Sequence, residues 1–156
     1  MKKINWKELI VNLLIVYAVA GLSAFISNQG MKDYAALNKP PLTPPGVVFP
    51  IVWTILFTLM GISAYLVFES LSDRRDFPFT IYALQLIFNF FWSIIFFNSK
   101  QYFFALIWLV VLWFLILGMI IAFYRHNKLA AYLQIPYLVW VTFAGYLNAG
   151  VWLLNR

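Results

Sequence analysis

Five long apolar runs constrain this chain more than any other feature of its sequence. They cover residues 9–26, 47–68, 79–97, 102–124 and 129–154, and none contains Asp, Glu, Lys, Arg or His. A run of about twenty apolar residues is long enough to cross a bilayer, where a helix satisfies all of its backbone polar groups internally. The sequence therefore predicts an all-α integral membrane protein, a single domain over residues 1–156 that forms a bundle of five transmembrane helices.

The composition agrees with a membrane protein. Hydrophobic residues make up 64% of the chain and charged residues only 10%, whereas soluble domains carry about 25% charged residues. The chain has no cysteine, which excludes disulfides, thiol catalysis and thiolate metal sites. The net charge is +6, but the basic residues are confined to loops and chain ends, a distribution that favours membrane orientation over nucleic-acid binding.

The basic residues also predict which way the chain crosses the membrane. They divide into a larger group on one side and a smaller group on the other. The larger group is Lys2, Lys3, Lys7, Arg74, Arg75, Arg125 and Lys128, and the smaller group is Lys32, Lys39, Lys100 and Arg156. By the positive-inside rule, the N-terminus is expected in the cytoplasm, and the loop between the first two runs and the C-terminus are expected outside the cell membrane.

The loop between the first two runs, residues 27–46, leads into a proline-rich stretch. Five of the seven prolines fall between residues 40 and 50. Proline fixes φ and restricts the residue before it, so residues 40–45 should form a stiff lid. In the run that follows, Trp53 and Phe57 lie one helical turn apart on the same face. This arrangement predicts the mouth of a binding pocket, and the alternative is an interfacial tryptophan anchor beneath an ordinary loop.

Small residues gather in two of the runs. The first run carries Ala18, Ala20, Gly21, Ser23 and Ala24 in its second half, and the second run carries Thr54, Thr58, Gly61, Ser63 and Ala64. Small side chains let transmembrane helices approach closely. Both stretches are therefore expected to pack against a neighbouring helix.

The polar side chains within the third and fifth runs are mainly amides, and they lie on two helix faces. One face comprises Gln85, Asn89 and Trp92, and the other comprises Trp140, Ala144, Leu147 and Asn148. Amides in a bundle often only join helices by hydrogen bonds, and for Gln85 and Asn148 this alternative is as good as ligand binding. Trp53, Asn89 and Trp140 together predict a pocket, because rings with N–H donors in an apolar wall suit a flat, mostly apolar ligand.

The runs contain no ionisable group of the kind that coupled transport or haem ligation needs. Ion-coupled carriers usually place such a group within the membrane, so an ion pump or proton-driven transporter is not favoured. The single histidine, His126, lies in the short connection before the last run. With no cysteine and no other histidine, the chain is poorly equipped to ligate a haem iron, and no metal or cofactor is expected.

Three blocks of residues resemble the tryptophan-rich sensory protein and translocator protein family, also called peripheral-type benzodiazepine receptors. The blocks are Pro44-Pro45-Gly46 with Phe49-Pro50 and Trp53; Gln85-Leu86 with Asn89, Trp92 and Phe96-Phe97; and Pro136-Tyr137-Leu138 with Trp140, Phe143-Ala144, Leu147-Asn148 and Trp152. They occur in the family's order and with its spacing. On these residues, the chain is similar to a bacterial member of that family.

The resemblance implies a five-helix bundle, often a homodimer, with a ligand cavity beneath the loop between the first two helices. It implies binding of porphyrins, notably protoporphyrin IX, and of synthetic isoquinoline carboxamides and benzodiazepines. Carried over residue by residue, the cavity would be lined by Tyr34, Pro44, Trp53, Phe57, Asn89, Phe90, Trp140, Phe143, Ala144 and Leu147. Trp53 and Trp140 match the family's photochemically important pair, so light-dependent oxidative degradation of a metal-free porphyrin is expected, with its propionates near Lys32 or Lys39.

Two other functions stay open at this point. The chain could transport tetrapyrroles or similar amphiphiles unchanged, or it could sense them and act through a partner that contacts the charged loop Glu69–Asp76. Animal members of the family carry a proposed cholesterol motif near the end of the fifth helix. Here no basic residue follows Tyr146 within a few positions, so specific cholesterol binding is not predicted.

Overall fold

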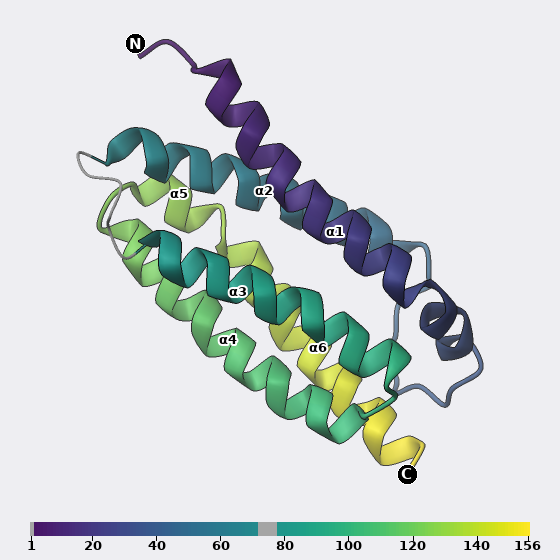
Figure 1. Ribbon diagram of the computed structural model, residues 1–156. Coiled ribbons are helices and arrows are strands. Elements are labelled where there is room, and N and C mark those ends of the chain that lie inside the picture. Colours follow the sequence, from purple (N-terminus) through teal and green to yellow (C-terminus); the bar gives the residue numbers. More distant parts are fainter. Residues whose placement is uncertain (1, 72–77) are drawn as a thin grey trace.

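The computed structural model describes residues 2–71 and 78–156, which leaves most of the charged loop Glu69–Asp76, with Arg74 and Arg75, outside the described residues. The helices of the described part are α1 (Trp6–Tyr34), α2 (Val48–Ser70), α3 (Pro78–Ser93), a π-helical turn (Ile94–Asn98), α4 (Tyr102–Tyr124), α5 (Lys128–Tyr132) and α6 (Ile135–Leu154) (Figure 1). Within this part, five helical segments are long and apolar enough to cross a membrane, the fifth made of α5 and α6 together. The predicted all-α membrane fold is confirmed, and the chain is a multi-pass membrane protein.

The first helix is longer than the first apolar run. α1 extends to Tyr34, so residues 27–34, which were expected in the lid loop, are helical instead. High hydropathy marks only the part of a helix that lies in lipid, and the stretch 28–33, which carries Asn28, Gln29, Lys32 and Asp33, continues the helix beyond that part. The connection to α2 is therefore shortened to residues 35–47, called the strap below.

The fifth run, residues 129–154, was expected to form one transmembrane helix, but it is broken before Pro136. α5 ends at Tyr132 and α6 begins at Ile135, so that Pro136 lies in the first turn of α6. Proline is tolerated there because the N–H groups of the first turn have no intrahelical partner. The break places Tyr137 on the buried face at the start of α6.

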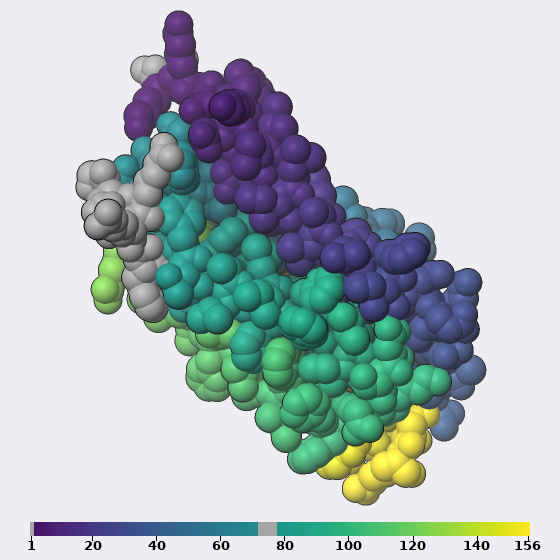
Figure 2. Space-filling view, in the orientation of Figure 1, coloured from purple at the N-terminus to yellow at the C-terminus, as the bar shows by residue number. Residues whose placement is uncertain are grey.

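The helices form an elongated bundle, and the chain ends lie at opposite ends of it (Figure 1). α4 packs against α3 and α6, whereas α1 packs against α2 and also contacts α3 and the π-helical turn. Figure 2 shows α1 lying across one side of the bundle. Fully buried side chains of α2, α4 and α6, among them Met60, Leu112, Ile116 and Tyr137, belong to the main core.

The end of α1 next to the strap is fastened to the end of α3. The hydroxyl oxygens of Ser27 and Ser93 lie 3.1 Å apart and share a hydrogen bond. Gly30 permits this close approach, because a Cβ at that position would collide with the backbone of Phe97. These contacts hold the last turns of α1 against the end of α3 and the π-helical turn.

The strap is fastened to α6. The Asn155 side chain accepts a hydrogen bond from the Asn38 N–H at 3.1 Å and donates one from Nδ2 to the Asn38 carbonyl at 2.7 Å. The Tyr146 hydroxyl donates to the carbonyl of Pro41 at 2.8 Å. The stretch that joins α1 to α2 is thereby held against the last helix at the C-terminal end of the bundle.

Candidate functional site

A cavity of about 560 Å³ lies inside the bundle, and α1, α2, α3, the π-helical turn and α6 all contribute to its wall. The volume falls in the range of sites for small organic molecules, about 300–1,000 Å³. Most of the wall is apolar, with a few hydroxyl and amide groups set among aromatic rings. This combination suits a ligand that is large, flat and mainly apolar.

Two indoles reach the cavity from different helices. Trp53 of α2 lies edge-on to Tyr137, with ring centroids 6.2 Å apart, and beside Phe57 at 5.7 Å. Trp140 of α6 lies edge-on to Phe49 with ring centroids 6.0 Å apart. Such aromatic pairs contribute about 0.5–1.5 kcal/mol beyond the burial of area. The two indoles are therefore held in position by the protein itself.

A buried chain of hydrogen bonds orients the amide of Asn89. The Tyr137 hydroxyl donates to Gln85 Oε1 at 2.9 Å and accepts from Asn89 Nδ2 at 2.7 Å. A tyrosine hydroxyl has one proton to donate, so the Asn89 NH₂ group is turned toward Tyr137. Asn89 also lines the cavity, where its Oδ1 is left as the hydrogen-bond acceptor.

Trp140 carries a hydrogen-bond donor without a partner. Its Nε1–H is buried and has no hydrogen-bond partner among the described residues, which costs about 1–3 kcal/mol. Trp92 differs, because its Nε1–H donates to Asn148 Oδ1 at 3.1 Å while Asn148 Nδ2 donates to the Tyr102 carbonyl at 2.8 Å. Asn148 thus joins three parts of the bundle as well as lining the cavity.

The structure brings most of the expected site residues together. Those on the cavity wall are Tyr34, Trp53, Phe57, Asn89, Trp140, Ala144 and Leu147. Pro44, Phe90 and Phe143 do not line it, contrary to expectation. Phe90 is one position off the helix face that carries Asn89 and packs against Phe91, and Phe143 packs beside Trp140 with ring centroids 5.5 Å apart. The strap, which contains Pro44, contributes Gly46 to the wall.

The wall also includes residues that the sequence did not indicate. Ala20, Gly21 and Ala24 of α1 border the cavity, although their run of small residues was expected to pack closely against a helix. A Cβ placed on Gly21 would meet nothing within 4 Å, so these small side chains leave space open. Phe96 and Phe97 reach the wall from the π-helical turn, whose altered period redirects side chains in a way that α-helical spacing does not predict.

Comparisons with known proteins agree with this architecture. The model of the TspO/MBR family matches residues 11–153. A tryptophan-rich protein TspO from Chlorobaculum tepidum is 36% identical over 156 residues, which cover 99% of this chain and 98% of the relative. The translocator protein of Homo sapiens is 36% identical over 137 residues, 86% of this chain and 81% of the relative. A tryptophan-rich sensory protein from Cereibacter sphaeroides is 38% identical over 122 residues, 78% of this chain and 76% of the relative. The chain belongs to the TspO/MBR family.

Proposed function

We propose that this protein binds protoporphyrin IX, or a closely related metal-free tetrapyrrole, in the cavity and promotes its light-dependent oxidative degradation. One observation carries the proposal: two indoles from different helices, Trp53 and Trp140, border one cavity. The relatives, named as tryptophan-rich, sensory and translocator proteins, agree with a sensory or translocator role in the membrane. The porphyrin itself comes from the family resemblance of the sequence.

The wall offers a hydrogen-bond acceptor to such a guest. Asn89 lines the cavity, and its Oδ1 can accept from a pyrrole N–H. A porphyrin without a metal carries inner N–H groups, which a metalloporphyrin has lost. The sole histidine, His126, follows the end of α4 that lies away from the strap, so a metal-free guest is favoured over haem.

The proposed chemistry uses light and dioxygen. Light excites the bound porphyrin, and dioxygen is the oxidant that opens the ring. The indole of Trp53 or Trp140 donates an electron to the excited ring or traps the reactive oxygen species formed beside it. The porphyrin supplies the photochemistry, and the protein supplies its position and two oxidisable side chains.

The same cavity is proposed to bind isoquinoline carboxamides and benzodiazepines. Their fused aromatic rings match the apolar wall and its aromatic side chains. Such a ligand should compete with protoporphyrin for one site. A homodimer, an N-terminus in the cytoplasm and a strap outside the cell membrane remain part of the proposal.

The second candidate function is transport or sensing without chemistry. The names of the relatives, translocator protein and tryptophan-rich sensory protein, favour it. A carrier or sensor would bind protoporphyrin and release it unchanged after illumination. A sensor would in addition need a partner, and deleting the charged loop Glu69–Asp76 would abolish its effect in cells without weakening porphyrin binding.

Illumination of tryptophan variants separates the two functions. The double variant Trp53→Phe with Trp140→Phe keeps aromatic rings on the wall, so it should bind protoporphyrin in the dark but degrade it much more slowly in light. The matched control replaces Trp108 and Trp113, whose indoles bond to Phe88 and Thr142 and do not line the cavity. Degradation at the wild-type rate in the first variant, followed by absorbance, would show that the two indoles do not take part.

A further inference from the structure

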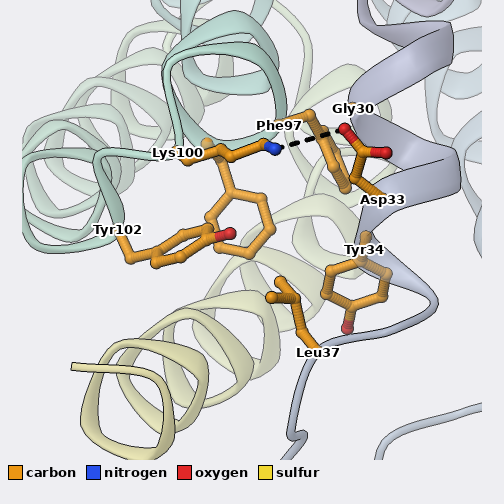
Figure 3. A pocket seen from close by; sticks show the side chains of 8 residues that line it. Gly30, Asp33, Tyr34, Leu37, Phe97, Lys100 and Tyr102 are labelled. Carbon is orange, nitrogen blue, oxygen red and sulfur yellow. Dashed lines mark ion pairs between the residues drawn. The ribbon is translucent and has the colours of Figure 1, made fainter.

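A small hollow adjoins the cavity at the strap end of the bundle. Its volume is about 60 Å³, and its wall includes Asp33, Lys100 and Tyr102 (Figure 3). Tyr34, Phe96 and Phe97 border both this hollow and the main cavity. These three residues therefore belong to the boundary between the main cavity and the polar side chains of the hollow.

An ion pair spans the hollow. Lys100 Nζ lies 3.2 Å from Asp33 Oδ2, and the two side chains are 53% and 43% exposed (Figure 3). Lys100 adopts a φ of 52°, a left-handed conformation that is uncommon for residues other than glycine. Exposed ion pairs of this kind are weak, so another carboxylate can take the place of Asp33 without a large penalty.

The charges at this end of the bundle favour an anion. Asp33 is the one acidic residue between Glu8 and Glu69, and none follows Asp76, whereas Lys32, Lys39, Lys100 and Arg156 all belong to this end. Lys39 is engaged elsewhere, because its Nζ donates to the Ala35 carbonyl at 3.0 Å and lies over the Tyr34 ring. Lys100, in contrast, is already paired with a carboxylate, that of Asp33.

Tyr102 adds a second polar group to the hollow. Its hydroxyl is turned inward among the residues of the wall (Figure 3). The structure gives this hydroxyl no hydrogen-bond partner among the described residues, while its ring packs against Phe96 with centroids 5.1 Å apart. A phenolic O–H can donate to a carboxylate oxygen beside the lysine ammonium.

We propose that Lys100 and Tyr102 form a subsite for a carboxylate arm of the ligand, and that the Asp33 carboxylate pairs with Lys100 when the subsite is empty. The inference rests on the proposed function, because it needs a guest in the main cavity. It narrows the ligand class to flat amphiphiles with a carboxylate side chain, and it places that arm at Lys100, where Lys32 or Lys39 was expected.

The test compares protoporphyrin IX with its dimethyl ester, which lacks the negative arms. Both are titrated in the dark, at low salt and in neutral detergent micelles, against wild-type protein, Lys100→Gln, Lys100→Arg and Asp33→Asn. Lys100→Gln should weaken binding of the free acid by about two- to fivefold, the range of an exposed ion pair. Asp33→Asn should strengthen it by a similar factor because a competing carboxylate is removed, Lys100→Arg should match the wild type, and no variant should affect the ester.

The opposite signs of Lys100→Gln and Asp33→Asn distinguish the subsite from a structural clamp. A clamp between α1 and the connection before α4 predicts that both variants weaken binding of both porphyrins alike, and that result would overturn the subsite while leaving the main cavity in place. If the effect of a Lys100 variant on porphyrin binding depends on added anionic phospholipid and not on esterification of the porphyrin, Lys100 contacts a lipid headgroup. That result would also overturn the subsite. If wild-type protein binds neither porphyrin, the proposed function and the subsite fail together.

Discussion

Replacing Tyr137 with phenylalanine removes one hydroxyl from the middle of the buried chain of hydrogen bonds. The side chain is 0% exposed. Phenylalanine can keep the edge-on contact with Trp53, so the change is confined to the hydroxyl group. Both of its hydrogen bonds are lost, the one to Gln85 Oε1 and the one from Asn89 Nδ2.

The expected cost differs between the two ends of the chain. Gln85 is also 0% exposed, so its Oε1 cannot turn to water, and a buried acceptor left without a partner costs about 1–3 kcal/mol. Asn89 lines the cavity and can find another partner there, so its lost bond should cost about the average of an interhelical hydrogen bond in a membrane, 0.6 kcal/mol. Together, the free energy of unfolding should fall by about 2–4 kcal/mol.

Tyr82→Phe is the matched control. The Tyr82 hydroxyl is buried and has no hydrogen-bond partner among the described residues, so its removal should leave stability unchanged or raise it. Unfolding of both variants in mixed detergent micelles, followed by circular dichroism, gives the comparison. Equal stability of the two variants would refute the hydrogen-bonded chain and, with it, the orientation assigned to the Asn89 amide.

Three further predictions concern two helix glycines, the strap and the orientation of the chain in the membrane. Gly30→Ala should destabilise the protein by about 1–3 kcal/mol, because the new Cβ collides with the backbone of Phe97. Gly21→Ala should stabilise it by up to about 1 kcal/mol in the same unfolding assay, because alanine favours a helix and the new Cβ meets nothing within 4 Å. Asn155→Ala removes both bonds to the strap residue Asn38, so porphyrin should bind and leave faster in stopped-flow fluorescence, and unchanged rates would show that the strap does not control access. Because the chain has no cysteine, single cysteines report orientation: a membrane-impermeant maleimide added to intact cells should label Asn38→Cys and spare Lys2→Cys, and the reverse pattern would invert the topology.

The helices could be predicted from the sequence because the bilayer sets their length. The apolar run 102–124 coincides with α4, whose ends are both marked by polar or charged residues. Hydropathy failed where a helix leaves the lipid, which is why the last eight residues of α1, 27–34, were expected in a loop. It also could not tell a bend at Pro136 from a break before it, because proline is compatible with both.

The site was predictable where it depends on helical periodicity. Trp53 and Phe57 on one helix, and Trp140 with Ala144 and Leu147 on another, reach the cavity because residues spaced by three or four share a face. Periodicity does not say which face of one helix meets which face of another, so the link from Gln85 through Tyr137 to Asn89 could not be foreseen. The redirection of Phe96 and Phe97 by the π-helical turn could not be foreseen either, because α-helical spacing does not predict where such a turn occurs.

The proposed function requires one flat aromatic guest in the cavity between the indoles of α2 and α6. A dark titration of purified protein with protoporphyrin IX, read by porphyrin absorbance and tryptophan fluorescence, measures this occupancy. We expect saturation at one porphyrin per chain, with quenched fluorescence, and displacement of the porphyrin by an isoquinoline carboxamide. Uptake that never saturates and equals partition into empty micelles would refute a defined binding site.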